Sequence, residues 1–271
     1  MKKRRMLIAP VFIPMAGCPH RCIYCNQATL HPGDARLPDE AELDEVAARY
    51  LGYARDPSSY DVRELAFYGG NFTGLSQTVK RDLLAAARAV VRRHGFDSIR
   101  VSARPDDLTA VEAQFLSGNG VRFVETGAQS MNDLVLELAE RGHTAADVVA
   151  AVKNLQAAKI GAGVHLMLGL PGSDEPCDLE SAEAVAALKP DTVRVHPTVV
   201  LKNSRLEIDW REGRYTPLTL DEAVSRTRKV LAVFQKAGIP VIRVGLHGDD
   251  ELLSGRAVVA GPFHPSLRSL V

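Results

Sequence analysis

The sequence predicts an α/β protein, a partial TIM-like barrel of six or seven β/α units in a single domain. Short runs rich in β-branched residues alternate with longer amphipathic runs along the 271 residues, as in parallel strands joined by helices. Turns such as KIGAG and KAGIP place glycines where helices end. Six or seven units are too few for a closed eightfold barrel, so we expect an open one.

Each element can be assigned from its residue pattern. The strands are expected at 6–13, 64–70, 98–104, 121–127, 161–169, 192–200 and 240–246. Helices, with apolar residues three and four positions apart, are expected at 39–54, 76–94, 107–117, 131–140, 145–158, 178–188 and 219–237. Thr219, with Glu222 three positions later, is typical of a capped helix start.

Two segments are expected to lie outside the repeating units. The polar stretch 202–217 is expected to form an insertion over one end of the barrel. Residues 1–246 are expected to form the barrel, and residues 247–271 a short C-terminal extension that packs on it. Phe263 and His264 in this extension are candidates to close the open side.

Composition limits the classes of function. Apolar residues make up 46% of the chain, so a core can form without disulfides, and 33 basic residues balance 33 acidic ones. This balance gives no general attraction to nucleic acid. The start MKKRRMLIAPVFIP is too short and too rich in proline for a signal peptide. No apolar run approaches the ~20 residues of a membrane helix, and crowded cysteines indicate a reducing, cytoplasmic location without membrane partners.

Three of the four cysteines, Cys18, Cys22 and Cys25, lie within eight positions after the first expected strand. Three thiols in one loop cannot all pair into disulfides, so the cluster indicates a metal site. A zinc site that adds His20 as the fourth ligand is the alternative. Cys177, which precedes a helix, is expected to be a bystander.

The other unusual motifs also follow strands. YGGNFTG, SARPD, ETGAQS, HLMLGLPG and VHPT come at the ends of the second to sixth expected strands. The carboxyl ends of parallel strands meet at one edge of such a fold, where active sites are built. The sequence therefore predicts one site that includes the cysteine loop.

These motifs, over roughly residues 8–246, resemble the radical S-adenosylmethionine (SAM) superfamily. Within it, they are similar to the radical domain of the Elongator catalytic subunit and to oxygen-independent coproporphyrinogen dehydrogenase. The resemblance implies a 4Fe–4S cluster on the three cysteines, with one iron left for SAM. It also implies reductive cleavage of SAM to a 5′-deoxyadenosyl radical, which abstracts hydrogen from a substrate.

The resemblance implies which residues of this chain contact SAM. Ser102 departs from the family pattern, and Asn71 stands where many relatives have Glu or Thr, so its contact would run through a side-chain or backbone oxygen. The implied SAM contacts are Tyr24, Gly69, Gly70, Asn71, Thr73, Ser102, Arg104, Glu125, Gln129, Arg141, His165, Met167 and Leu168. The structural alternatives are a core aromatic for Tyr24, an ordinary turn for the glycines, and surface ion pairs for Glu125, Gln129 and Arg141.

Residues that act on the substrate are less well defined. The candidates are His143, His165, His196 and Arg243, which are expected inside the barrel. A histidine there is more often a satisfied core residue than a catalyst, and Arg243 would bind an anionic group or pair with a carboxylate.

The sequence does not decide between two classes of substrate: RNA, in particular tRNA, and a small metabolite or peptide. The alternative to an enzyme is a non-catalytic metal-binding module. A reducing partner of the flavodoxin or ferredoxin type is expected. The basic helix 80–95 could contact RNA, but its charges at 80, 81, 88, 92 and 93 lie opposite an apolar stripe and indicate a solvated face.

Overall fold

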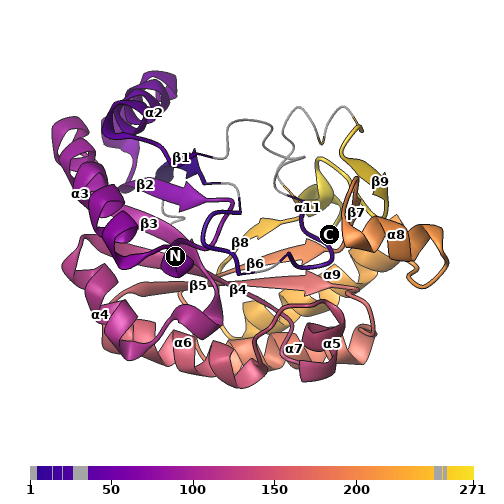
Figure 1. Ribbon diagram of the computed structural model, residues 1–271. Coiled ribbons are helices and arrows are strands. Elements are labelled where there is room, and N and C mark those ends of the chain that lie inside the picture. Colours follow the sequence, from indigo (N-terminus) through magenta and orange to yellow (C-terminus); the bar gives the residue numbers. More distant parts are fainter. Residues whose placement is uncertain (1–4, 14, 20, 27–35, 247–251, 253–254) are drawn as a thin grey trace.

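Seven parallel strands form one sheet whose order, β1-β2-β3-β4-β5-β6-β8, follows the chain. The computed structural model describes residues 5–13, 15–19, 21–26, 36–246, 252 and 255–271. The strands span Met6–Phe12 (β1), Val62–Tyr68 (β2), Ser98–Ala103 (β3), Val121–Gln129 (β4), Gly161–Leu168 (β5), Thr192–Pro197 (β6) and Val241–Val244 (β8). In Figure 1 the sheet curls into a half-barrel with helices along its outside. The predicted partial barrel is confirmed.

The helices lie close to their expected positions. They span Glu40–Tyr53 (α2), Gln77–His94 (α3), Ala110–Gly118 (α4), Asp133–Leu138 (α5), Ala145–Ala157 (α6), Glu175–Ala187 (α7) and Leu220–Lys236 (α9). The predicted cap is confirmed: Thr219 and Glu222 form a reciprocal capping box at the start of α9. Helix α7 begins three residues earlier than expected, because Asp174 accepts a hydrogen bond from the Cys177 N–H and Pro176 fits the first turn.

The two faces of the sheet differ in character because alternate side chains of a strand point to opposite sides. On the outer face, residues such as Phe67, Val101 and Val195 are fully buried beneath the helices. On the inner face, the strands carry charged residues, Glu125 on β4 and Arg194 on β6 among them. The apolar core therefore lies between sheet and helices, and the inside of the half-barrel is polar.

The predicted insertion 202–217 contains one helix, Arg205–Arg211 (α8). Just before it, Val200–Leu201 (β7) pairs antiparallel with Val258–Ala260 (β9) of the C-terminal segment. The last helix, Leu267–Leu270 (α11), lies beside β8, where Arg268 Nη1 donates to the Val241 carbonyl at 2.8 Å. This segment therefore contacts the edge strand of the barrel.

One expectation about the basic helix was wrong. Lys80 of α3 is only 5% exposed, because its ammonium donates to both Glu112 carboxylate oxygens, at 2.7 and 2.8 Å, and to the Thr73 carbonyl. Its charge joins two helices and is not part of a solvated face. None of the helices in the described part of the chain has the length and hydropathy that crossing a bilayer requires.

Candidate functional site

The cysteine loop lies at the carboxyl end of β1, as predicted. Cys18 is exposed, Cys25 is half-buried and Cys22 is buried. Backbone hydrogen bonds hold the loop: the Cys18 N–H donates to Met15 O, and the Cys25 N–H to Cys22 O. The Ile23 N–H reaches the Ala139 carbonyl at 3.3 Å, which ties the loop to the far side of the site.

The glycine segment after β2 packs directly against this loop. The Met15 N–H donates to Gly69 O at 2.9 Å, and the Asn71 N–H donates to Ala16 O at 2.8 Å. A Cβ on Gly74 would lie 2.0 Å from the Gly17 carbonyl oxygen, and one on Gly70 would also meet loop backbone. These positions require glycine because two backbones touch there.

The Asn71 side chain connects the cysteine loop to three other residues by hydrogen bonds. It is 1% exposed, and its amide donates to Gly17 O at 3.0 Å and to Asp107 Oδ2 at 2.5 Å. Its Oδ1 accepts from the Thr73 hydroxyl at 2.8 Å and from the Arg104 N–H at 3.0 Å. The residues predicted from YGGNFTG and SARPD are thus brought together under the cysteines.

Arg141 connects the loop to the end of β4. Its Nη1 donates to Cys22 Sγ at 3.0 Å and its Nη2 donates to the Gly127 carbonyl at 2.6 Å. Gln129, with φ of +66°, ends β4 and folds its side chain over Gly127. A third predicted group, ETGAQS with Arg141, therefore meets the cysteine loop.

Burial and nearby charges shift the pKa of one loop thiol, Cys18, and of Tyr24. Burial and the neighbouring Cys22 raise the pKa of Cys18, and the guanidinium groups of Arg104 and Arg141 act in the opposite direction. Burial raises the pKa of Tyr24 well above its usual range. Tyr24 and Met167, both predicted to contact SAM, pack against the same apolar cluster of Val135, Ala139 and Leu170.

A second set of predicted residues lies deeper, around Glu125. This carboxylate accepts from Arg100 at 2.8 Å, Arg194 at 2.5 Å and the Tyr68 hydroxyl at 2.9 Å, and His165 Nε2 lies 2.5 Å away. Burial alone would raise the pKa of Glu125, but these donors hold it well below its usual value. The surface ion pair considered for Glu125 is excluded, because its side chain is 1% exposed.

The pKa values of the three candidate histidines are lowered. Burial, with the charge of Arg141, lowers the pKa of His143 to about 4, and its Nε2 donates to the Ala128 carbonyl. Burial, with nearby His165, lowers the pKa of His196 to about 3, and the two rings meet edge to face. Burial also lowers the pKa of His165.

The remaining predicted residues have simpler surroundings. Leu168 is 1% exposed in the core, and its carbonyl accepts from the Thr198 N–H at 2.9 Å. Ser102 is half-buried on β3. Arg243 lies next to Arg194 in the strand register, and burial together with the Arg194 charge lowers its pKa.

Tyr68, Arg100 and Arg194 complete the network around Glu125 and were not predicted as site residues from the sequence. A signal was available: Arg100 and Arg194 are charged residues in the middle of strongly apolar strands. Such residues are rarely buried unless they are paired.

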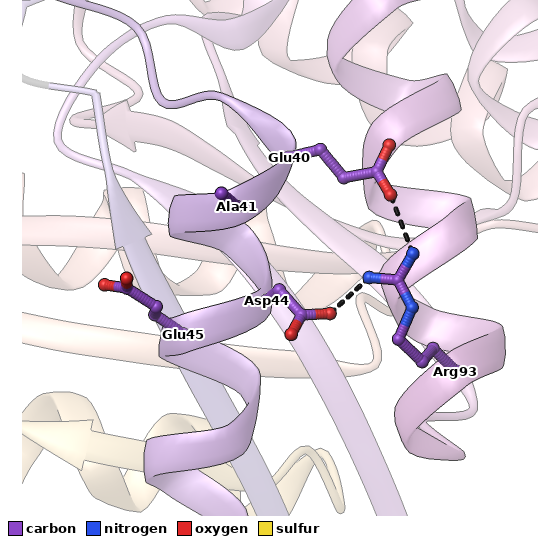
Figure 2. A pocket seen from close by; sticks show the side chains of 5 residues that line it. All are labelled: Glu40, Ala41, Asp44, Glu45 and Arg93. Carbon is purple, nitrogen blue, oxygen red and sulfur yellow. Dashed lines mark hydrogen bonds and ion pairs between the residues drawn. The ribbon is translucent and has the colours of Figure 1, made fainter.

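The surface hollow of about 450 Å³ between α2 and α3 holds none of the predicted residues (Figure 2). It is lined by Glu40, Ala41, Asp44, Glu45 and Arg93. The Arg93 guanidinium pairs with both Glu40 and Asp44, so its charges are already matched.

The donor atoms of the cysteine loop decide which metal group the site suits. Within the described ranges, no three side chains among His, Cys, Asp and Glu are grouped as ligands of one ion. His20, the fourth donor of the zinc alternative, lies outside the described residues. The three thiols share one loop, Cys22 accepts a hydrogen bond from Arg141, and Cys18 lies near the charges of Arg104 and Arg141, so the loop fits an anionic thiolate-bound cluster in donor type and charge.

Two family models match the chain. The one described as the Radical SAM superfamily covers residues 12–185, and a Radical_SAM C-terminal domain covers residues 190–271. Among curated proteins, a tRNA uridine(34) acetyltransferase of Dehalococcoides mccartyi is 29% identical over 74% of this chain and 50% of its own length. One of Methanocaldococcus jannaschii is 31% identical over 48% of this chain and 25% of its own. The chain thus spans half or less of these relatives.

Solved structures show the same fold. The Elp3 of Methanocaldococcus infernus matches with a TM-score of 0.75 over 98% of this chain and 62% of its own, at 19% identity. The coproporphyrinogen III oxidase HemN of Escherichia coli matches with a TM-score of 0.61 over 87% of this chain and 54% of its own, at 18% identity. The similarity to both groups expected from the motifs is confirmed.

Proposed function

This chain belongs to the radical SAM superfamily, and on that basis we propose that it uses a 4Fe–4S cluster on Cys18, Cys22 and Cys25 to cleave SAM and abstract hydrogen from a substrate. When bound, the cluster and SAM would supply an electron and a 5′-deoxyadenosyl radical. The observation that carries the proposal is the convergence on one loop of the thiols, the glycine segment and Arg141.

The chain's own residues would hold these groups in place. Arg141 would hold the loop against β4 through its hydrogen bonds to the Cys22 sulfur and the Gly127 carbonyl, and Asn71 would hold it through the Gly17 carbonyl. The residues that we propose for the SAM site, as direct contacts or as residues that position them, are Tyr24, Gly69, Gly70, Asn71, Thr73, Ser102, Arg104, Glu125, Gln129, Arg141, His165, Met167 and Leu168. Because Asn71 and Glu125 already use their side-chain oxygens within the chain, we expect them to act by positioning neighbours.

We propose an RNA nucleoside, in tRNA, as the substrate. Two relatives that are named tRNA uridine(34) acetyltransferase support this choice, although the chain matches only part of each. A reducing partner of the flavodoxin or ferredoxin type, and a cytoplasmic location, complete the proposal.

Anaerobically reconstituted protein tests the proposed chemistry. With SAM and dithionite we expect 5′-deoxyadenosine, and bulk tRNA should raise its rate of formation several-fold, while the same mass of double-stranded DNA should not. A protein that forms no deoxyadenosine would refute the radical chemistry. Equal rates with tRNA, DNA and buffer would refute the substrate alone.

A further inference from the structure

The first cysteine of the loop and the last two are held by different parts of the chain. The Cys18 N–H donates to the nearby Met15 carbonyl, next to the glycine segment that follows β2. Ile23, which lies between Cys22 and Cys25, bonds instead to segments far along the chain. The geometry of the three thiols therefore depends on two distant regions that meet at this loop.

The backbone of Ile23 is fixed on both sides. Its N–H donates to the Ala139 carbonyl, at the end of α5, and its carbonyl accepts from the Leu206 N–H at 2.8 Å. Leu206 lies in the first turn of α8, where backbone N–H groups have no acceptor within the helix. The Cys22 carbonyl accepts from the Cys25 N–H at 3.0 Å. The short stretch between these two cysteines is thus tied to α5 and α8.

The Ile23 side chain is buried among residues that come after β6. It is 3% exposed and forms one apolar cluster with Val200 of β7, Leu206 of α8 and Tyr215, which we call the loop anchor. Val259 of β9 packs against the loop anchor from the C-terminal segment. In Figure 1, α8, β7 and β9 lie together beside one end of the half-barrel. Apolar burial therefore adds to the hydrogen bonds that hold the loop.

A polar contact to the same region follows the last cysteine. Asn26 is 7% exposed, and its Nδ2 donates to the Lys202 carbonyl at 2.8 Å. The Lys202 N–H donates to the Ala257 carbonyl at 2.8 Å, so this contact joins the loop to the ribbon of β7 and β9. Cys25 thus lies between two residues, Ile23 and Asn26, that the region after β6 holds in place.

We propose that Ile23 is a positioning residue for the iron–sulfur cluster, and that the loop anchor sets where Cys22 and Cys25 lie. The inference rests on the proposed function and gives β7, α8 and β9 a part in it. Residues that orient metal ligands affect affinity even where every ligand is kept. Removal of the Ile23 side chain should therefore loosen two of the three thiols and leave all of them present.

Ile23→Ala tests the inference, with Ile160→Ala as the matched control. Ile160 is also 3% exposed, but it precedes β5 and so lies at the opposite edge of the sheet. In the iron-free protein, I23A should speed alkylation of the buried Cys22 by iodoacetamide by roughly threefold or more, as measured by tandem mass spectrometry, and I160A should not.

The reconstituted protein gives the second measurement. After desalting, I23A should retain about a third of the wild-type iron or less, and the electron paramagnetic resonance spectrum of its reduced cluster should change. I160A should keep both, and I23V, which restores most of the buried surface, should recover most of the iron. L206A, which removes a side chain of the loop anchor and leaves the loop sequence intact, should reproduce the effects of I23A.

Equal alkylation of Cys22 in I23A and I160A, or equal iron loss in the two variants, would overturn the inference and leave the proposed function standing. Circular dichroism shows whether each variant is folded, and L206A with I23V decides the matter if I23A is not. A wild-type protein that binds no iron refutes the proposed function. The alkylation rates do not depend on that result, because they are measured without iron.

Discussion

The Arg141 guanidinium donates to the Cys22 sulfur at 3.0 Å and to the Gly127 carbonyl at 2.6 Å, so one side chain joins the cysteine loop to strand β4. Arg141 and Cys22 are 119 positions apart in the chain. This contact makes the loop part of the barrel edge, and it places a fixed positive charge beside a thiol that would have to ionise to bind metal.

Replacing Arg141 by lysine should keep the charge but lose the two-pronged contact. One ammonium cannot reach both the Cys22 sulfur and the Gly127 carbonyl with the same geometry. We expect the iron retained after desalting to fall at least twofold, with about 1–3 kcal/mol lost in the free energy of unfolding. R205K, an exposed change on α8, should alter neither quantity. Full iron retention by R141K would show that the contact does not support the cluster.

Replacing Gly74 by alanine should displace the cysteine loop, because the new Cβ would lie 2.0 Å from the Gly17 carbonyl oxygen. The expected result is loss of most reconstituted iron while circular dichroism shows the helices intact. Gly52, inside α2, is the matched control, since nothing lies within 4 Å of its Cβ position. G52A should stabilise the protein by up to about 1 kcal/mol. Normal iron loading in G74A would mean that the loop and the glycine segment are not rigidly coupled.

Replacing Glu125 by glutamine should leave Arg100 and Arg194 buried without their shared negative charge. Removing one partner of a buried ion pair costs about 3–5 kcal/mol, which urea denaturation can measure. E212Q is the control, because the carboxylate of Glu212 is exposed on the surface. This substitution should change the free energy of unfolding by about 0.5 kcal/mol or less. A small effect of E125Q would show that the inner network contributes little to folding.

The pH dependence of stability should reflect the neutral histidines. The pKa of His143 is lowered to about 4 and that of His196 to about 3, so the unfolded chain binds protons below about pH 6.5 that the folded protein does not. Stability should therefore fall as the pH drops from about 6.5 toward 4, by at most about 1.4 kcal/mol per histidine for each pH unit. Urea midpoints measured at about pH 7 and pH 5 check this. H196N should flatten the dependence, and an unchanged slope would contradict the burial of this ring in its neutral form.

Periodicity and strand-end motifs were sufficient to predict the barrel and the elements that meet at its edge. The cysteines and Gly69–Thr73 could be placed together because parallel strands align their carboxyl ends, whereas Arg141 was predicted from the family resemblance alone. Contacts across the barrel could not be predicted, because they depend on which inner residues of distant strands meet. Tyr68 and Arg194 illustrate this limit: they are 126 positions apart and touch only once the sheet has curled. Lys80 was misplaced for a related reason, because its partner Glu112 lies on another helix.

The most direct test of the central claim is an iron and sulfide count on anaerobically reconstituted wild-type protein, C22A and C177A. We expect about four irons and four sulfides per chain in the wild type and in C177A, and almost none in C22A. Cys177 is a suitable control because it is a half-buried thiol outside the loop. Zinc in place of iron, or a full cluster in C22A, would contradict the assignment of Cys18, Cys22 and Cys25 as the cluster ligands.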